Sequence, residues 1–191
     1  MMADNTVQPI TLNLIPGGRC IDFWVKQVQL VARPAEHPPF ATEAVVLEED
    51  TYLVLSAEAV VRQTDEHPIR LMTALFDQQP LEPGCVVVRG NRLLAVIHDL
   101  DRDPTCCEQW VSQALQACLK QADQLGVRSL TLPLLGSVHG RIPYSRCLVL
   151  IVEAVEEATF HALRRVWLVV PETQQMGVEQ FLRLRAVTGS R

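Results

Sequence analysis

The stretch Leu130–Ser145, LTLPLLGSVHGRIPYS, joins an apolar run to a polar loop that is bounded by glycines. The apolar part and the residues just before it (127–135) alternate too little for a half-exposed strand, and they predict a buried, central strand. The loop begins at Gly136, directly after this strand. Open α/β sheets bind ligands beyond the carboxyl ends of their strands, so the stretch predicts both a fold and a place for function.

Outward from this stretch, the preceding helix has the strongest boundary signals. Thr105 and Glu108 form a T-x-x-E pattern, which predicts a capping box at the start of the helix. Apolar residues recur on one helical face up to position 125, and Gly126 is expected to be the C-cap. We therefore expect a helix over 105–125 that packs on the sheet through one face.

The segment after the loop also predicts a helix. Ser145 is expected to cap it, and it runs to about Glu157. Periodicity alone would equally allow a strand at its apolar centre, but the length of the segment favours a helix. A strand over 164–171 and a closing helix over 173–185 follow. In the closing helix, the residues that are expected to face the core are Met176, Phe181 and Leu184.

The order of these segments predicts the fold class. From Cys85 the chain reads strand, strand, helix, strand, helix, strand, helix, with a turn at Gly90-Asn91 between the first two strands. Strands that alternate with helices form a largely parallel sheet covered by helices. We therefore predict an α/β protein with a three-layer α/β/α fold and a mixed, largely parallel sheet.

The earlier part of the chain reads as an extension of that sheet. Residues 8–31 predict a β-hairpin with a turn at positions 16–18, and residues 32–43 form a proline-rich loop. One or two strands are expected over 44–56 and a helix over 67–78. The prediction is one domain over 1–191, with an N-terminal β arm and loop (1–43) before the core (44–191).

Composition and charge exclude several classes of function. The chain has 191 residues, 48% hydrophobic and 20% charged, with a formal net charge of -5. This balance argues against nucleic-acid and membrane-surface partners, which favour a basic stripe. The start has no secretory pattern and no apolar run is long enough for a bilayer, so we expect a cytoplasmic protein.

The six cysteines do not predict a metal site. None forms a C-x-x-C pair, and no two histidines have ligand spacing. We expect no metal and no cofactor, and cysteines that act as small buried hydrophobes.

The loop itself has the composition of an anion site. Glycines allow close backbone approach, successive amides can form a nest for an anion, and the hydroxyl and cationic side chains add donors. Phosphate or pyrophosphate is the natural ligand, although two glycines also suit a simple tight turn. The candidate ligand-binding residues are Gly136, Ser137, Val138, His139, Gly140 and Arg141.

Three segments, taken in order, resemble a known family. These segments are PGCVVVRGNRLLAVIHDL (83–100), EQWVSQALQACLKQADQLGVRSLTLPLLGSVHG (108–140) and RRVWLVVPE (164–172). Together they resemble the macro domain, the ADP-ribose-binding α/β/α fold, over about half of the chain. The resemblance implies that the loop at 136–141 wraps the diphosphate of a nucleotide such as ADP-ribose. It also implies that His98 has a structural role.

The first half of the chain departs from the family pattern. The family carries an Asn-Ala-Ala-Asn element after its first buried strand. At the corresponding place this sequence has Ser56, Ala57 and Glu58, which we take as a further candidate part of the cleft. No glycine occurs between Arg19 and Glu82, so the family's first glycine-rich loop is absent. The resemblance therefore does not imply de-ADP-ribosylation, and no catalytic residue is assigned.

Three functions stay open at this point. One is a binding module for ADP-ribose or a related phosphorylated nucleotide. Another is a degenerate macro fold without a ligand, which serves homo-oligomerisation or partner binding. The third is an ADP-ribosyl or phosphoester hydrolase with His139 or Glu58 as the general base.

Overall fold

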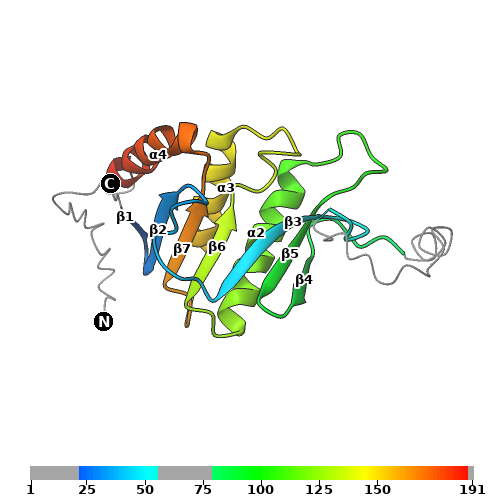
Figure 1. Ribbon diagram of the computed structural model, residues 1–191, viewed down its shortest axis with the longest axis horizontal. Coiled ribbons are helices and arrows are strands. Elements are labelled where there is room, and N and C mark those ends of the chain that lie inside the picture. Colours follow the sequence, from blue (N-terminus) through cyan, green and yellow to red (C-terminus); the bar gives the residue numbers. More distant parts are fainter. Residues whose placement is uncertain (1–21, 56–78, 189–191) are drawn as a thin grey trace, which may run out of the picture.

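One mixed sheet organises the protein. The computed structural model describes residues 22–55 and 79–188, and within them seven strands form a sheet in the order β1-β2-β7-β6-β3-β5-β4 (Figure 1). The strands are β1 (Asp22–Val25), β2 (Val28–Arg33), β3 (Ala44–Asp50), β4 (Val86–Arg89), β5 (Arg92–His98), β6 (Ser129–Pro133) and β7 (Arg165–Val169). The helical elements are α2 (Glu108–Gln124), α3 (Tyr144–Glu157), η1 (Glu172–Gln174) and α4 (Gln175–Thr188).

The pairing confirms the predicted α/β class with a largely parallel sheet. The five inner strands, β2, β7, β6, β3 and β5, run parallel, whereas β1 and β4 pair antiparallel at the two edges. The β4–β5 hairpin turns at Gly90, which has a φ of 61°, as the Gly90-Asn91 pattern predicts. The helix predicted over 67–78 lies outside the described residues.

The N-terminal hairpin lies later in the chain than the sequence pattern indicates. The predicted strand over 20–31 is broken at Lys26 and Gln27, where Lys26 has a φ of 53°, and its two halves pair as β1 and β2. The expected first strand and its turn at 16–18 lie outside the described residues. Since β2 pairs with β7, the hairpin extends the sheet beyond its last core strand.

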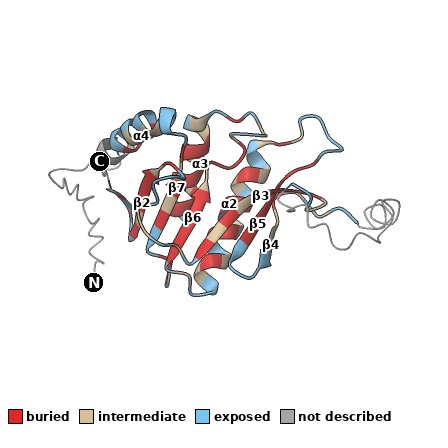
Figure 2. Cartoon of the chain, viewed as in Figure 1, coloured by how far each residue is buried: buried red, intermediate tan, exposed pale blue. Residues whose placement is uncertain are grey.

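The core lies between one face of the sheet and three helices. Alternate residues of the strands, such as Leu30, Leu130 and Leu168, form one buried cluster with the apolar faces of α2, α3 and α4. Figure 2 shows this burial along the inner strands and on the helix surfaces that face them. Full burial of such a leucine stabilises the fold by about 2 kcal/mol. The prediction that 127–135 is a central, buried strand is confirmed, because β6 lies between β7 and β3 and its first four residues are buried.

The start of α2 corrects the predicted capping box. The helix begins at Glu108 after Cys107, and no side chain caps it. Thr105 instead belongs to the preceding loop, where its carbonyl accepts a hydrogen bond from the Asp99 amide at 2.8 Å. Gly126 is confirmed as the residue that ends the helix: it has a φ of 76° and its amide donates to the carbonyl of Asp123 at 3.0 Å.

The start of α3 corrects the predicted serine cap. The segment is a helix, as its length predicts, but it begins at Tyr144 after Pro143, so Ser145 lies inside the first turn and caps nothing. A proline at this place needs no amide partner, and its fixed φ suits the entry into a helix.

The inward face of α4 also differs from the prediction. Met176 and Leu184 are 73% and 63% exposed, whereas Val178 and Leu182 are buried and Phe181 is partly buried against the core. The prediction of Met176 and Leu184 was therefore wrong. The pair that packs inward is spaced by four residues, which places both side chains on one helical stripe. Among the helices of residues 22–55 and 79–188, none is long and apolar enough to cross a membrane.

Candidate functional site

A pocket lies at the carboxyl ends of the parallel strands, where the sheet topology predicts ligand binding. Its volume is about 370 Å³, and it is lined by residues 35–36 after β2, Glu48 of β3, residues 133–134 and 137–138 at the end of β6, and residues 169–172 at the end of β7. Four strands thus contribute to it. From the predicted loop, Ser137 and Val138 lie in the pocket wall.

The two glycines of the loop are required for different reasons. Gly136 has a φ of 78°, and a side-chain carbon there would lie 2.9 Å from Cδ1 of Ile142. At Gly140 such a carbon would lie 2.6 Å from Sγ of Cys106 and 2.7 Å from the Gly136 carbonyl oxygen. The loop is therefore folded back on itself and packed against the segment before α2. Backbone conformation and close packing both restrict Gly136, whereas close packing alone restricts Gly140.

The amides of the loop divide into two groups. The Gly136 amide donates to Oε1 of Glu48 at 2.8 Å, and the Ser137 amide donates to the Leu134 carbonyl at 3.0 Å. The next four amides, at 138–141, have no hydrogen-bond partner among residues 22–55 and 79–188. Val138 is 69% exposed, and His139 and Arg141 are also exposed. This half of the loop therefore offers free donors to the solvent.

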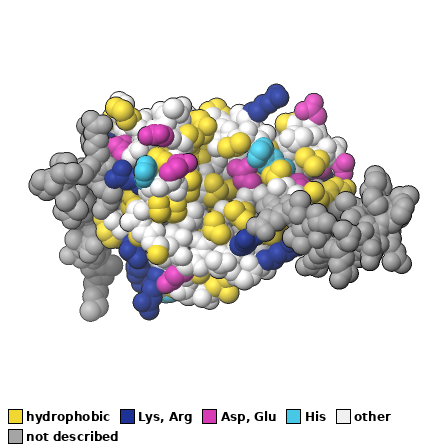
Figure 3. All heavy atoms as spheres, in the orientation of Figure 1, with side chains coloured by type: hydrophobic (Ala, Val, Ile, Leu, Met, Phe, Trp, Pro, Cys, Tyr) yellow, Lys and Arg dark blue, Asp and Glu magenta, His cyan; other side chains and the backbone are white. Residues whose placement is uncertain are grey.

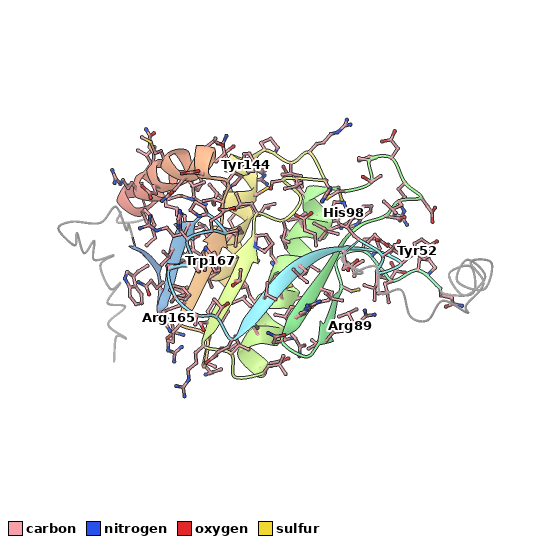
Figure 4. All side chains as sticks on the ribbon, in the orientation of Figure 1. Tyr52, Arg89, His98, Tyr144, Arg165 and Trp167 are labelled. Atoms are coloured by element: carbon pink, nitrogen blue, oxygen red, sulfur yellow. The ribbon has the colours of Figure 1, made fainter. Side chains whose placement is uncertain are left out.

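Glu48 holds the base of the loop. It lies near the carboxyl end of β3, and its Oε2 is 3.2 Å from Nε2 of His98 on β5. Its side chain is 11% exposed and that of His98 is 3% exposed. His98 ends its strand at the same edge of the sheet (Figure 4), and its ring meets the ring of His139 edge-on with centroids 6.0 Å apart. The arrangement agrees with a structural role for His98, which orients a carboxylate.

Solved structures resemble the fold of this chain, although no protein-family model and no curated protein matches the sequence. The Oceanobacillus iheyensis macrodomain with ADP matches with a TM-score of 0.61 and 13% identity, over 89% of this chain and 97% of that chain. The macrodomain of Thermus aquaticus DarG matches with a TM-score of 0.53 and 21% identity, over 74% of this chain and 98% of that chain. This chain has the macrodomain fold. A mutant of the Oceanobacillus iheyensis macrodomain was also solved with ADP-ribose, at a TM-score of 0.61 to this chain.

Within this macrodomain fold, the pocket has an acidic lining. Within residues 22–55 and 79–188, its charged lining residues are glutamates, at positions 36, 48 and 172. On the face of the sheet in Figure 3, hydrophobic side chains gather near the centre, with acidic side chains beside them. Arg141, the cationic residue of the predicted loop, is exposed and does not line the pocket. Among the described residues, no basic side chain lines the wall, so an anion held by these residues would rely on amides and hydroxyls.

Two cysteines near the loop are not nucleophiles. Burial, followed by the charge of Glu48, raises the pKa of the Cys106 thiol to about 12. The same two causes raise the pKa of Cys147 to about 11, and its Sγ donates to the Leu135 carbonyl at 3.3 Å. Both thiols stay protonated at neutral pH, so they serve as small packing groups. Among the described residues, no cluster of His, Cys, Asp and Glu could hold a metal ion.

The structure locates part of the predicted site. Of the loop 136–141, Ser137 and Val138 line the pocket, whereas Ser56, Ala57 and Glu58 lie outside the described residues. β3 ends at Asp50, so the residues at the end of this buried strand are Glu48, Glu49 and Asp50. The carboxylate of Asp50 caps the following turn by accepting the amides of Tyr52, at 2.6 Å, and Leu55, at 2.8 Å. Sequence reasoning missed Glu48, although a run of three acidic residues at the end of an apolar strand is itself an unusual signal.

Proposed function

We propose that this protein is a binding module for a phosphorylated nucleotide, either ADP-ribose or a related one. Two observations support the proposal: the pocket at the carboxyl ends of four parallel strands, whose wall includes Ser137 and Val138, and four consecutive loop amides, at 138–141, that have no hydrogen-bond partner among the described residues. Amides in series form a concave donor surface for the oxygens of a phosphate, and they do so without a basic side chain. Ser137 adds a hydroxyl donor in the pocket wall.

The size and place of the pocket support the same proposal. Pockets for small molecules have volumes of about 300–1,000 Å³ and combine apolar walls with a few polar groups. Here the apolar walls come from Pro133, Leu134 and Val138, and from Val169–Pro171. The sugar and base of a nucleotide would lie on these walls, and the phosphate would face the loop. The solved structures with ADP and ADP-ribose lend support at the level of the fold alone.

One observation favours a second candidate, a macrodomain fold without a ligand that serves oligomerisation or partner binding. The Gly136 amide already donates a hydrogen bond to Glu48, and three glutamates line the pocket. In that case Val138, which is 69% exposed, would belong to a protein contact instead of a ligand site. Hydrolysis finds less support, because His139 is exposed and Glu58 lies outside the described residues.

A thermal-shift titration with ADP-ribose tests the proposal, with AMP and pyrophosphate as comparison ligands. At a ligand concentration of one hundred times Kd, binding stabilises the native state by about 2.7 kcal/mol. For a protein of this size, that raises the Tm by about 5–10 °C.

A variant that fills the pocket makes the test specific. Ala35 is exposed and lines the pocket, so Ala35→Trp should abolish the shift without loss of the fold. The same substitution at Ala41, which is also exposed but does not line the pocket, should leave the shift intact. No shift with any of the three ligands at millimolar concentration would contradict the proposal and favour the second candidate.

A further inference from the structure

Glu48 combines two properties that bear on which phosphorylated ligands fit the pocket. Its two carboxylate oxygens are both engaged, Oε1 by the Gly136 amide at 2.8 Å and Oε2 by Nε2 of His98 at 3.2 Å. These contacts tie it to the loop and to β5, while its own strand lies inside the sheet between β6 and β5. A side chain held by two elements keeps its position when a ligand enters, so the charge of Glu48 is a fixed feature of the pocket wall.

The groups around Glu48 offer little compensating charge. The thiols of Cys106 and Cys147 are buried, and burial is the main reason that their pKa values rise, so they contribute no charge of their own. In the described part of the chain, the other charged residues of the pocket wall are Glu36 and Glu172. Besides His98, the ionisable ring close to this network is His139, which meets His98 edge-on. A second anion beside Glu48 would therefore meet a like charge in a partly buried setting, where screening by water is weak.

The number of amide donors in the loop also limits how many phosphate groups it can bind. Of the six amides from Gly136 to Arg141, those of Gly136 and Ser137 donate within the protein, and the other four have no partner among residues 22–55 and 79–188. Four amides can satisfy the oxygens of one phosphate group. A second phosphate would have to reach along the loop to Gly136, whose amide already donates to Glu48. At the Gly136 end of the loop, a second phosphate would therefore lack a free amide donor and would be repelled by the charge of Glu48.

We propose that Glu48 determines the specificity of this pocket, and that it selects a ligand with one phosphate, a nucleoside or sugar monophosphate, against a ligand with a diphosphate. This inference rests on the proposed function, because it requires that the pocket binds a phosphorylated ligand. It narrows that function, since AMP becomes a better ligand than ADP or ADP-ribose.

Calorimetric titration of the full chain with AMP, ADP and ADP-ribose tests the inference directly. The wild-type protein should bind AMP with the lowest Kd of the three. ADP-ribose binding that is tighter than AMP binding would overturn the inference. This ranking needs no variant, so it remains a test even if a substitution at Glu48 prevents folding.

Glu48→Gln separates the charge from the shape of the side chain. A glutamine can still accept from the Gly136 amide through its oxygen and can donate to a nitrogen of His98, so both contacts can persist. Loss of the charge should tighten the binding of ADP and ADP-ribose about tenfold or more, and that of AMP by less than about threefold. An equal change for all three ligands, or no change, would overturn the assignment of specificity to Glu48.

Glu43→Gln is the matched control. Glu43 precedes the same strand at its opposite end, and its Oε2 also accepts a backbone amide, that of Arg128 at 2.6 Å. This substitution removes one charge in a similar contact away from the pocket, so all three Kd values should stay as in the wild type. If none of the three ligands binds any variant, the proposed function itself fails. If they bind but follow another order, only the specificity inference fails.

Discussion

At both edges of the parallel sheet, a carboxylate accepts hydrogen bonds from backbone amides of a loop, but the number of amides that it accepts differs. At the amino edge, the Asp123 carboxylate accepts the amides of His161, Ala162 and Leu163 at 2.9, 2.7 and 3.0 Å, in the loop that leads into β7. At the carboxyl edge, the Glu48 carboxylate accepts the amide of Gly136 alone. In the loop at 161–163, successive amides donate to the carboxylate of Asp123. In the loop at 136–141, the amides at 138–141 have no hydrogen-bond partner in the described part of the chain.

This difference separates a structural loop from a candidate binding loop. Backbone amides are strong donors that native structures normally satisfy, with protein atoms or with water. The loop at 161–163 is satisfied by the protein and has no donor left at these positions for a ligand. The amides at 138–141 must find partners outside the described residues, and solvent or an anion can supply them. These amides without a partner in the described part of the chain, more than the carboxylate itself, are the reason that we propose the carboxyl edge as the place of function.

The largest effect on stability is expected from Gly136→Ala. The residue has a φ of 78°, and its new methyl group would lie 2.9 Å from Ile142, so backbone strain adds to a steric conflict. We expect a loss of about 3 kcal/mol in the free energy of unfolding, measured by urea denaturation.

The amino edge supplies the control for this change. Gly126 has a nearly equal φ of 76°, but nothing lies within 4 Å of an added methyl group, so Gly126→Ala should cost only about 1 kcal/mol. Equal losses in unfolding free energy for Gly136→Ala and Gly126→Ala would mean that backbone strain alone accounts for both. Close packing around Gly136 would then not contribute to the stability of the loop at 136–141.

A smaller effect that depends on pH is expected from Asp123→Asn. Burial alone raises the pKa of Asp123, but the amides of Leu163, His161 and Ala162 outweigh it, and the net shift is downward. A lowered folded-state pKa means that the charge stabilises the protein above the ordinary pKa of a carboxyl group, and that this stabilisation disappears as the pH falls through the folded-state pKa.

Asp123→Asn should therefore cost about 1 kcal/mol at neutral pH, and this cost should shrink as the pH falls below the ordinary pKa of an aspartate. Unfolding by urea at several pH values measures the difference between wild type and variant. Glu156→Gln, which changes an exposed carboxylate with no hydrogen bond in the described part of the chain, should show no such dependence. A cost for Asp123→Asn that is constant with pH would show that the charge is not what holds the loop.

The smallest effect is expected where a carboxylate contacts an exposed side chain and no backbone amide. Nε of Arg146, in α3, is 2.8 Å from Oε2 of Glu108, in α2, and the two side chains are 42% and 46% exposed. Arg146→Gln should change the free energy of unfolding by less than about 0.5 kcal/mol. A loss as large as that of Asp123→Asn would contradict the view that backbone amides are the partners that make these carboxylates important.

Sequence patterns predicted the kind and order of the elements from Cys85 to the end of α4, and the place of the loop after β6. These features depend on local periodicity and on residues with special backbone freedom, such as Gly90 and Gly126, which act on their immediate neighbours. Helix boundaries were less accurate. A capping pattern such as that of Thr105 and Glu108 cannot show that the threonine carbonyl is used by a neighbouring loop.

The groups that meet at the candidate site could not be predicted in this way, because they come from distant parts of the chain. Glu48 contacts the Gly136 amide 88 positions away and His98 50 positions away, so no local pattern contains either contact. The inward face of α4 was decided in the same manner, by where the sheet edge and α3 meet the helix. Local patterns predict elements because neighbours in the chain set backbone conformation, whereas the chemistry of a site depends on the packing that brings distant residues together.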